Sequence, residues 1–283
     1  MSDWLRTAIK RVPGAKSAYS GFFNLMDRFW NSRSWISRTR TTPFGFPLTG
    51  GNSIHHRAMQ DGTFEPEETA IIGERRVADY DVFVDVGANI GYFSCLARKA
   101  GKHVIAFEPQ PSNLAHLYRN FAENGWNDGE VFPVGLSRAP GIATLYGASS
   151  TGASLIAGWA GASKATKTII PLSTLDIAIG DRFPGKRLFV KIDTEGVEYD
   201  VLLGGLKLLD RQPRPIWMIE ITAREFYPGG SNPHFTAIFE EFARRGYAAR
   251  AIGAEDGVLS ADDVRRLADG TNPAKIGFNF LFS

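Results

Sequence analysis

The chain has 283 residues but only one cysteine, Cys95. A single cysteine excludes an intrachain disulfide and a cysteine-rich zinc site, and it is consistent with a reducing compartment. The sequence also lacks an apolar run long enough to span a bilayer, and its first residues do not resemble a secretory leader. We therefore expect a cytoplasmic protein in which Cys95 is a packed core thiol and not a nucleophile.

The chain also lacks a large excess of charge of either sign, because its formal net charge is only +2. Bulk electrostatics therefore does not favour nucleic acid as a partner. The charge is uneven along the chain, since residues 1–40 contain eight Lys or Arg residues and two acids. Their net charge of +6 leaves −4 for residues 41–283, in which we find no basic stripe.

Residues 1–40 show the periodicity of a basic amphipathic helix, with Arg28 among the polar positions. The apolar residues at helical spacing are Tyr19, Phe22, Phe23, Met26, Phe29 and Trp30. Such an arm either packs on its own domain or a second subunit, or lies on an anionic membrane at the periphery. With an extended hairpin or loop at 41–52, we expect residues 1–61 to form one region and residues 62–283 the main domain.

From residue 65 onward, strand and helix patterns alternate. Acids followed by apolar residues predict a helix over 65–79. Apolar runs predict strands at 82–86, 103–108, 130–134, 187–192, 215–221, 247–252 and 276–283. Helical periodicity predicts helices near 90–100, 111–124, 197–209 and 233–245. This alternation predicts an α/β fold, with a mostly parallel sheet covered by helices on both faces.

The alternation is interrupted between residues 134 and 187. Short strands are expected at 141–147 and 167–172, and they flank a stretch of small residues that is too long for an ordinary connection. This stretch is either a mobile lid or a local insertion. Trp159 at its centre either closes over a substrate or is simply buried.

The most informative motif joins the first two strands of the main domain. The run VFVDVGANIG ends a strand in Asp85 and continues into a glycine-spaced turn, and the next strand ends in Glu108. A side chain at Gly87 or Gly91 would keep the backbone away from a bound ligand. Glu108 suits a ribose, because a carboxylate accepts hydrogen bonds from both hydroxyl groups. The motif therefore predicts a nucleoside site at two strand ends.

The turn does not match a dinucleotide site. That fingerprint, G-x-G-x-x-G, places a pyrophosphate on a helix N-terminus, whereas Asn89 stands where its middle glycine would be. Asp85 would repel a pyrophosphate but not a cationic ligand. S-adenosylmethionine (SAM) has a ribose, a sulfonium and an ammonium but no phosphate, so the motif favours SAM over NAD. The alternative is a tight strand-to-helix turn that binds no ligand.

Two later strands also end in acids. Asp193 and Glu195 follow one of them, and Glu220 ends the next. Because the carboxyl ends of parallel strands meet at one edge of the sheet, we expect these acids to share a rim with the acids of the first motif. Carboxylates gathered in this way serve a cation, ligand protons or a metal. Helix capping by Thr194 or Glu195 is the structural alternative.

Several segments, in order along the chain, resemble the FkbM family of SAM-dependent methyltransferases. They are GTFEPEE, DVGANIGYFS, AFEPQPSNLAHLYRNFAENG, VKIDTEGVEYDVLLGG and the terminal FNFLF. The resemblance covers residues 62–283 and implies a class I methyltransferase domain. Its Rossmann-like sheet would have seven strands in the order 3-2-1-4-5-7-6, with the last strand antiparallel. The family further implies O-methylation of hydroxyl groups, often those of sugars or polyketides.

By this resemblance, eight residues would bind SAM. They are Asp85, Gly87, Ala88, Asn89, Gly91, Glu108, Pro109 and Ser137. Ser137 would lie near the adenine. The family commonly has an acid or Asn after that serine, whereas this chain has Arg138.

An O-methyltransferase needs a group that takes the proton of the acceptor hydroxyl or lowers its pKa. One route uses the carboxylate of Asp193, Glu195 or Glu220 as a general base. The other route uses Asp193 and Glu220 to hold a divalent metal such as Mg²⁺ through oxygen ligands. The sequence shows no third ligand for such a metal.

The acceptor is expected to be a small molecule or a glycan. Three histidines are candidates to contact it: His55, His56 and His234. Two other functions stay open. One is a SAM-binding scaffold or regulator without turnover. The other is methylation of a protein or a nucleic acid, although the sequence lacks the [N/D]-P-P-[F/Y/W] motif of amino-methylating enzymes.

Overall fold

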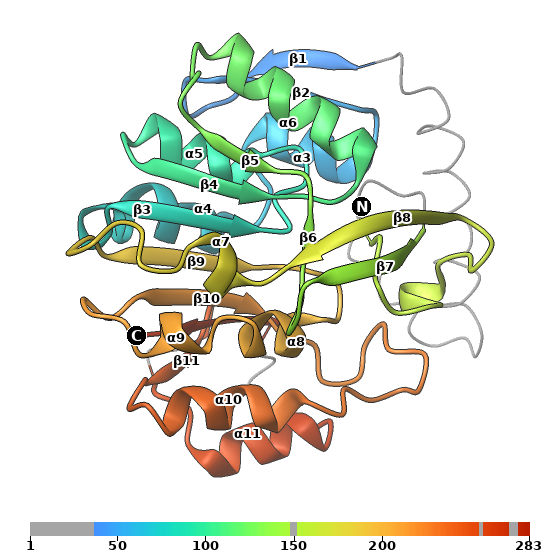
Figure 1. Cartoon of the computed structure of the whole chain (residues 1–283), viewed down its shortest axis with the longest axis vertical. Helices are drawn as coiled ribbons and strands as arrows, with labels where there is room; N and C mark the ends of the chain where they lie inside the picture. Colours follow the sequence, from blue (N-terminus) through green and yellow to red (C-terminus); the bar gives the residue numbers. More distant parts are fainter. Residues whose placement is uncertain (1–36, 148–151, 255–256, 272–276) are drawn as a thin grey trace.

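The computed structural model describes residues 37–147, 152–254, 257–271 and 277–283 (Figure 1). Nearly all of the predicted helical arm therefore lies outside the described residues. The arm's last residues are not helical, because Arg38–Thr41 form strand β1. The described residues form a two-stranded, a three-stranded and a seven-stranded sheet.

The seven-stranded sheet has the order β11-β12-β10-β9-β3-β4-β5. Its strands are β3 (Val82–Val86), β4 (His103–Phe107), β5 (Glu130–Phe132), β9 (Leu188–Ile192), β10 (Ile216–Glu220), β11 (Ala249–Ala251) and β12 (Asn279–Phe282). Numbered along the chain, these strands give the order 3-2-1-4-5-7-6. Strand β12 runs antiparallel to both of its neighbours. The predicted class I α/β fold, strand order and antiparallel last strand are confirmed.

Helices cover both faces of this sheet (Figure 1). Alternate residues of β3 pack into two hydrophobic clusters, Val82, Val84 and Val86 into one and Phe83 into the other. The cluster of Phe83 includes side chains of α5 (Tyr92–Lys99) and α6 (Pro111–Glu123). The opposite cluster includes side chains of α8 (Glu198–Leu203), α9 (Leu206–Leu209), α10 (Phe235–Ala243) and α11 (Ala261–Ala268). Cys95 is buried in the cluster that contains Phe83, as expected of a packed thiol.

Two predicted helices differ in detail from the structure. The helix expected over 65–79 begins as α4 (Pro66–Ala70), continues as the π-helical turn η1 (Ile71–Arg75) and ends in the short 3₁₀ turn η2 (Val77–Asp79). The helix expected over 197–209 breaks at Gly204 into α8 and α9. A Cβ added at Gly204 would lie 2.2 Å from the carbonyl oxygen of Ser137. This close approach of two backbones explains why a glycine interrupts the helix.

The expected hairpin is formed by β1 and β2 (Pro47–Gly50), and α3 (Ile54–Asp61) follows it. The side-chain amide of Asn120 on α6 donates to the carbonyl oxygens of Thr49 (3.0 Å) and Ile90 (2.7 Å). Its oxygen accepts from the backbone N–H of Thr49 at 2.6 Å. Phe46 and Leu48 are buried in the same cluster as α5 and α6. Hairpin and domain thus share one core, and the division at residue 61 stays a prediction.

The interruption of the α/β pattern contains the three-stranded sheet β6-β8-β7. Strand β6 (Gly135–Leu136) pairs parallel with β8 (Lys167–Ser173), and β7 (Gly141–Tyr146) pairs antiparallel with it. The two expected short strands are therefore confirmed. Between β7 and β8 lies the single turn η3 (Trp159–Gly161), and α7 (Leu175–Ala178) follows β8.

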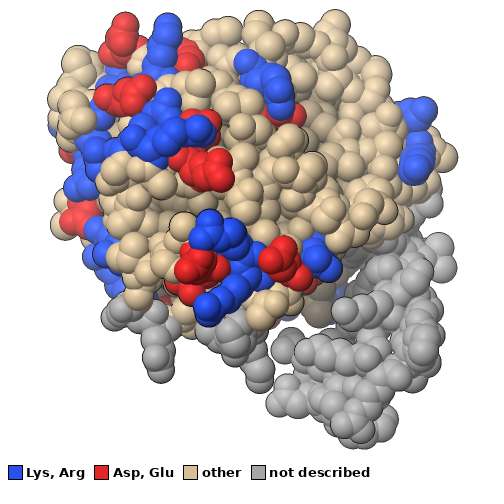
Figure 2. Space-filling model, turned by 90° about the horizontal axis from the view of Figure 1, so that it is seen from below, with Lys and Arg blue, Asp and Glu red and all other residues tan. Residues whose placement is uncertain are grey.

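The described surface shows no large separation of charge on the face drawn in Figure 2. Basic and acidic side chains lie beside one another there, among broad uncharged areas. Ion pairs such as Arg245 with Glu241 (2.8 Å) join charges of opposite sign. None of the helices in the described ranges combines the length and the apolar character that crossing a bilayer requires.

Candidate active site

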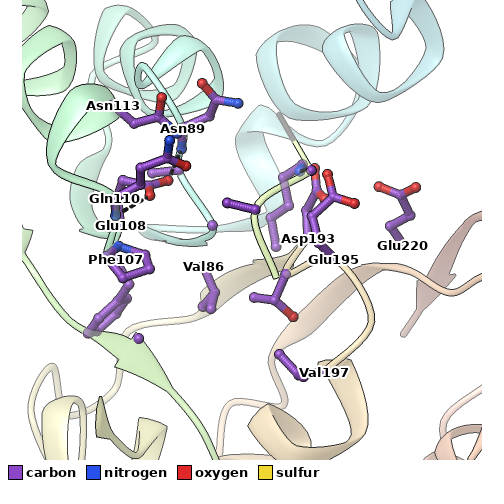
Figure 3. Close-up of a pocket in the computed structure, with 18 of the residues that line it drawn as sticks. Val86, Asn89, Phe107, Glu108, Gln110, Asn113, Asp193, Glu195, Val197 and Glu220 are labelled. Carbon is purple, nitrogen blue, oxygen red and sulfur yellow. Dashed lines mark hydrogen bonds and ion pairs between the residues drawn. The ribbon is translucent and has the colours of Figure 1, made fainter. Parts of the chain in front are cut away.

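A cavity of about 460 Å³ opens at the carboxyl ends of the central strands, within the size range of small-molecule sites. The predicted site residues that line it are Gly87, Ala88, Asn89, Glu108, Pro109, Asp193, Glu195 and Glu220. Asp85, Gly91 and Ser137 are not among its lining residues. In Figure 3, Asn89 and Glu108 lie at one side of the cavity and Asp193 and Glu220 at the other.

The glycine turn between β3 and α5 is fixed by the protein itself. Gly87 and Gly91 have φ angles of +84° and +85°, which favour glycine. A Cβ on Gly87 would lie 1.8 Å from the carbonyl oxygen of Asp193, and one on Gly91 would lie 2.4 Å from Leu117 Cδ1. The expected reason for these glycines was approach to a ligand. Packing against β9 and α6 requires them even without one.

Glu108 lies beneath the turn and holds it in place. Its Oε2 accepts from the backbone N–H of Asn89 (2.8 Å), and its Oε1 accepts from that of Gln110 (2.7 Å). Burial raises the pKa of Glu108 to about 7, against the two backbone hydrogen bonds, which favour the anion. A carboxylate has about four acceptor sites, and the Asn113 side chain also hydrogen-bonds Glu108, so about one site is left for a ligand hydroxyl group.

Asp85 supports the cavity from behind instead of lining it. Its carboxylate is buried and accepts from the hydroxyl group of Ser94 at 2.6 Å. In the parallel register, Asp85 pairs with Lys191 of β9, so both side chains project from the same face of the sheet. Burial raises the pKa of Asp85, and the nearby Lys191 ammonium opposes this rise.

Ser137 also lies outside the cavity wall. Its backbone N–H donates to the carbonyl oxygen of Ser173 (3.0 Å), and its own carbonyl packs against Gly204. The neighbouring Arg138 forms an ion pair with Asp200 of α8. The wall at this end is apolar and comes partly from the small sheet: Phe107, Val134, Leu136, Leu145, Ile170 and Val197. Sequence reasoning missed the small-sheet residues, because their contact with the cavity depends on tertiary packing.

Three carboxyl groups converge at the opposite end of the cavity. Asp193 follows β9, Glu220 ends β10, and Glu65 directly precedes α4. One carboxylate oxygen from each lies within 4.8 Å of the other two. Glu65 is a site residue that sequence reasoning missed, although the segment GTFEPEE that contains it was part of the family resemblance. A hard cation such as Mg²⁺ prefers this kind of all-oxygen ligand set.

Glu65 is held in the site by its neighbours in the chain. Its φ angle of +40° is unusual for a residue other than glycine. Phe64 packs edge-on against Tyr92, with ring centres 5.9 Å apart, and Pro66 begins α4. Burial raises the pKa of Glu65 to about 8. At neutral pH, Glu65 therefore favours its protonated form.

Lys191 is the second site residue that sequence reasoning missed. Its ammonium lies 2.8 Å from Oδ2 of Asp193 and 4.7 Å from the ring centre of Phe93. Although burial opposes ionisation, this ammonium holds the pKa of Asp193 below its usual value. Burial and the adjacent Asp193 carboxylate raise the pKa of Glu220 well above its usual value. A lysine inside the apolar strand LFVKI was the signal that could have revealed it.

Glu195 joins the insertion to the end of β9. Its Oε2 accepts from Nε1 of Trp159 at 2.6 Å, and its carbonyl oxygen accepts from the hydroxyl group of Ser154 at 2.6 Å. The expected helix cap is absent, because Val197 is the N-cap of α8 and neither Thr194 nor Glu195 caps it. Burial, followed by the nearby Asp193 carboxylate, raises the pKa of Glu195 to about 7.

Trp159 is buried, with 2% of its surface exposed, and it also ties the insertion over the cavity. Its ring covers Gly196, where an added Cβ would lie 2.3 Å from it. Tyr227 packs edge-on against this ring at 4.7 Å and donates to the carbonyl oxygen of Gly196 at 2.9 Å. Four small or apolar residues of the insertion line the cavity: Gly152, Ala153, Leu155 and Ala160.

The three candidate histidines occupy different surroundings. His55 is exposed and lines the cavity at its rim. His56 is buried, and its Nδ1 accepts from the backbone N–H of Gly51 at 2.9 Å. Burial lowers the pKa of His56 to about 4, so it is a neutral structural residue. His234 stacks on Tyr199, with ring centres 4.6 Å apart, and does not line the cavity.

The chain is similar in sequence to a known protein family and, remotely, to solved structures. A family model described as "Methyltransferase FkbM domain" matches residues 85–249. No curated protein matches the chain in sequence. A SAM-dependent methyltransferase from Agrobacterium tumefaciens has 11% identity over 87% of this chain and 69% of its own, with a TM-score of 0.43. A ribosomal protein L11 methylase from Lactobacillus delbrueckii subsp. bulgaricus has 14% identity over 83% and 81%, with a TM-score of 0.39.

The family match covers more than half of the chain, and it includes the glycine turn, Glu108, the acid at the end of β9 and the insertion. The sheet has the strand order that the resemblance implied. The chain therefore belongs to the FkbM family of SAM-dependent methyltransferases.

Proposed function

We propose that this enzyme transfers the methyl group of SAM to a hydroxyl group of a sugar, a glycan or a related natural product. The observation that carries the proposal is the convergence of Asp193, Glu220 and Glu65 at one end of a cavity whose other end is formed by the glycine turn and Glu108. Carboxyl groups suit a hydroxyl acceptor, because they bind its proton and can remove it.

In this proposal, one end of the cavity binds the cofactor and the other end binds the acceptor. Glu108 accepts a hydrogen bond from the ribose, and the apolar wall beside it receives the adenine. When bound, SAM supplies a methyl group on a positively charged sulfur. Asp193, whose ionised form Lys191 favours, would favour the cationic donor over its neutral product. Holding the acceptor oxygen in line with methyl and sulfur supplies much of the acceleration.

We assign the general base to Asp193. The new bond joins the acceptor oxygen to the methyl carbon as the carbon–sulfur bond breaks, and the hydroxyl proton passes to the carboxylate. Lys191 favours the ionised form of Asp193, which a base requires. Glu220 is better suited to orient the hydroxyl, because burial and the adjacent Asp193 raise its pKa and so disfavour the anion that a base requires. Glu195 is engaged by Trp159 and is the weakest of the three expected candidates.

The test of this assignment is Asp193→Asn. Turnover, measured as formation of S-adenosylhomocysteine (SAH) with a responsive acceptor, should fall by about 10²–10⁴-fold, while SAH binding measured by calorimetry is retained. Asp210→Asn is a matched control, since the Asp210 side chain is 65% exposed. Near-normal turnover in Asp193→Asn, and also in Glu220→Gln, would remove both acids from the mechanism.

A divalent metal is the second route that the site supports. Glu65, Asp193 and Glu220 supply three oxygen ligands, one more than the sequence predicted. Bound there, a metal would lower the pKa of an acceptor hydroxyl. Lys191 competes with it for Asp193. Unchanged turnover after EDTA treatment would exclude this route, whereas loss and recovery with Mg²⁺ would replace the general-base route.

Two other functions make different predictions. A SAM-binding scaffold would bind SAH but turn over no acceptor, which the assay above distinguishes. A methyltransferase for protein or nucleic acid would turn over a macromolecular acceptor and no small molecule. The mixed charges on the face in Figure 2 give no support to nucleic acid as a partner.

For the basic residues 1–40 we propose a peripheral membrane contact or a dimer contact. Their net charge of +6 suits an anionic bilayer. Salt-sensitive co-sedimentation with anionic liposomes, lost when residues 1–36 are deleted, would support the membrane contact. Concentration-dependent dimerisation that is lost with the same deletion would support the dimer.

A further inference from the structure

The acid-containing end of the cavity has an apolar rim. Ile54, in the first turn of α3, lines the cavity with 59% of its surface exposed. Phe226, in the loop after β10, lines it with 45% exposed. Large apolar side chains that stay exposed at the edge of a binding cavity are available to contact a ligand. We call Ile54, Phe226 and the adjacent His55 the acceptor rim.

The rim comes from other elements than the part of the cavity assigned to the cofactor. It is formed by α3 and the loop after β10, whereas the glycine turn follows β3 and Glu108 follows β4. Contacts of two rim residues place it beside the acids. The Phe226 ring lies 5.9 Å from the ring of Trp159, which donates to Glu195. The His55 ring lies 6.3 Å from that of Phe64, which directly precedes Glu65. An acceptor that reaches the acids (Figure 3) therefore passes apolar side chains.

The same end of the cavity offers little positive charge to an anionic acceptor. Among the lining residues, which belong to the described part of the chain, the groups that can carry positive charge are Lys191 and His55. The Lys191 ammonium is 3% exposed and paired with Asp193 at 2.8 Å. His55 lies at the outer rim. None of the lining residues is an arginine, the usual partner of a phosphate.

A phosphate or carboxylate at this end would therefore lose its hydration without gaining a cation in return. The loss is large, because an ionised group that is buried without a partner is strongly disfavoured. The three carboxyl groups add to the penalty, either by repulsion when ionised or by the need to stay protonated. A hydroxyl group meets the opposite conditions. Oε2 of Glu65 is buried and has no hydrogen-bond partner among the described residues, so it can pair with one.

We propose that this end of the cavity selects an uncharged, hydroxylated acceptor that carries an apolar group next to the reacting hydroxyl. It discriminates against acceptors with a phosphate or carboxylate at that position. This inference rests on the proposed function. Of the acceptor forms that a sugar methyltransferase can use, this favours a free or glycosidically linked sugar with an apolar substituent over a sugar phosphate or a nucleotide-linked sugar.

The test uses the full-length protein saturated with SAH, so that only the acceptor end is open. Calorimetric titrations compare phenyl glycosides of common hexoses with methyl glycosides, hexose 6-phosphates and nucleoside diphosphate hexoses. The expected order of affinity is phenyl glycoside first, methyl glycoside second and both anionic forms last. We expect the difference between the first and the last to be about tenfold or more.

Variants separate the two parts of the selection. Phe226→Ser should remove most of the preference for phenyl over methyl glycosides, whereas the control Ile169→Ser, on a residue 68% exposed on the outer face of β8, should not. Glu65→Gln combined with Glu220→Gln should narrow the gap between neutral and phosphorylated probes. The control Glu240→Gln, an exposed acid on α10, should leave that gap unchanged.

The proposal is overturned if a phosphorylated probe binds as tightly as its neutral counterpart, or if no glycoside binds the SAH complex. It is also overturned if Phe226→Ser and Ile169→Ser behave alike. The preceding SAH titration reports on the proposed function by itself. Failure to bind SAH would refute that function, whereas SAH binding with the wrong acceptor order refutes only the selection described here.

Discussion

The ammonium of Lys191 lies 2.8 Å from Oδ2 of Asp193, and the same lysine pairs in register with Asp85 on the neighbouring strand. Only 3% of the Lys191 side chain is exposed, against 22% for Asp193. This contact links the interior of the sheet to the wall of the cavity. The ammonium also favours the ionised form of Asp193, whereas burial raises the pKa of the neighbouring Glu220 and Glu65.

Lys191→Met should therefore change both stability and catalysis. Removing one partner of a buried ion pair costs roughly 3–5 kcal/mol of unfolding free energy. Without the ammonium, the pKa of Asp193 should rise, so the pH at which kcat/KM falls to half on the acidic side should move upward. Urea unfolding and a pH–rate profile measure the two effects.

Two further variants check this reasoning. Lys186→Met should change stability by less than about 0.5 kcal/mol, since the Lys186 side chain is 58% exposed and pairs with Asp81 at 3.5 Å. Lys191→Met combined with Asp193→Leu should recover part of the lost stability, because no charge is left unpaired. If Lys191→Met alone were as stable as the wild type, the buried ion pair between Lys191 and Asp193 would not stabilise the fold.

Gly87→Ala tests whether protein packing fixes the glycine turn. The matched control is Gly101→Ala, because Gly101 has a similar φ angle of +81° but no atom within 4 Å of an added Cβ. The control should lose about 1–2 kcal/mol from the left-handed backbone alone. Gly87→Ala should lose several kcal/mol more and should not bind SAH. Equal losses in the two variants, measured by urea unfolding, would show that the approach of Asp193 is unimportant.

Trp159→Phe tests the contact that closes the insertion over the cavity. The variant keeps an aromatic ring but loses the hydrogen bond to Glu195, so we expect a loss of about 1–3 kcal/mol and weaker SAH binding. Trp126→Phe removes the same atoms from a ring that packs against Phe46 and Phe121 without an indole hydrogen bond in the described part of the chain. Unchanged SAH affinity in Trp159→Phe would separate the insertion from cofactor binding.

Glu65→Gln should alter the pH dependence of stability. Glu65 keeps its proton up to a pKa of about 8 in the folded protein, against an ordinary value of 4.5. The folded state therefore binds more protons than the unfolded state between these pH values, and stability falls as pH rises through that window. This one group accounts for at most about 1.4 kcal/mol per pH unit.

The advantage of Glu65→Gln over the wild type should thus grow from pH 5 to pH 8 and level off above it. Urea unfolding at pH 5.5, 7 and 8.5 measures this difference. Glu240→Gln, on an exposed acid, should run parallel to the wild type over the same range. A parallel curve for Glu65→Gln as well would mean that Glu65 is ionised in the folded protein.

The sheet was predictable because its strands are apolar runs that each carry their own signal. The family resemblance added the strand order, which periodicity alone does not contain. The end of β9 was predictable for the same reason, since an acid directly follows a buried strand. Glu195 was expected to be catalytic or to cap a helix, but its partner Trp159 lies in the insertion, and no local pattern joins the two.

Glu65 and Lys191 were not predicted, for two different physical reasons. Glu65 precedes α4, whose Thr69 hydrogen-bonds Tyr92 of α5 at 3.1 Å, so its position in the site depends on tertiary structure. Lys191 stands inside a strand whose other residues are apolar, where a lysine is usually taken as exposed. The Asp85 carboxylate shows the reverse case. Its position at the end of an apolar run suggested direct contact with a ligand. The carboxylate is instead buried and accepts a hydrogen bond from Ser94.

The hairpin β1–β2 has a practical consequence for anyone who trims this protein. A fragment that starts at residue 62 would keep every strand of the main sheet. It would lack Phe46, Leu48 and Met59, which pack into the hydrophobic cluster beside α5 and α6. The side chain of Asn120, on α6, would also lose its partner Thr49. Such a fragment would expose apolar surface to other copies of itself. Its aggregation during purification would therefore not show whether the catalytic part can fold.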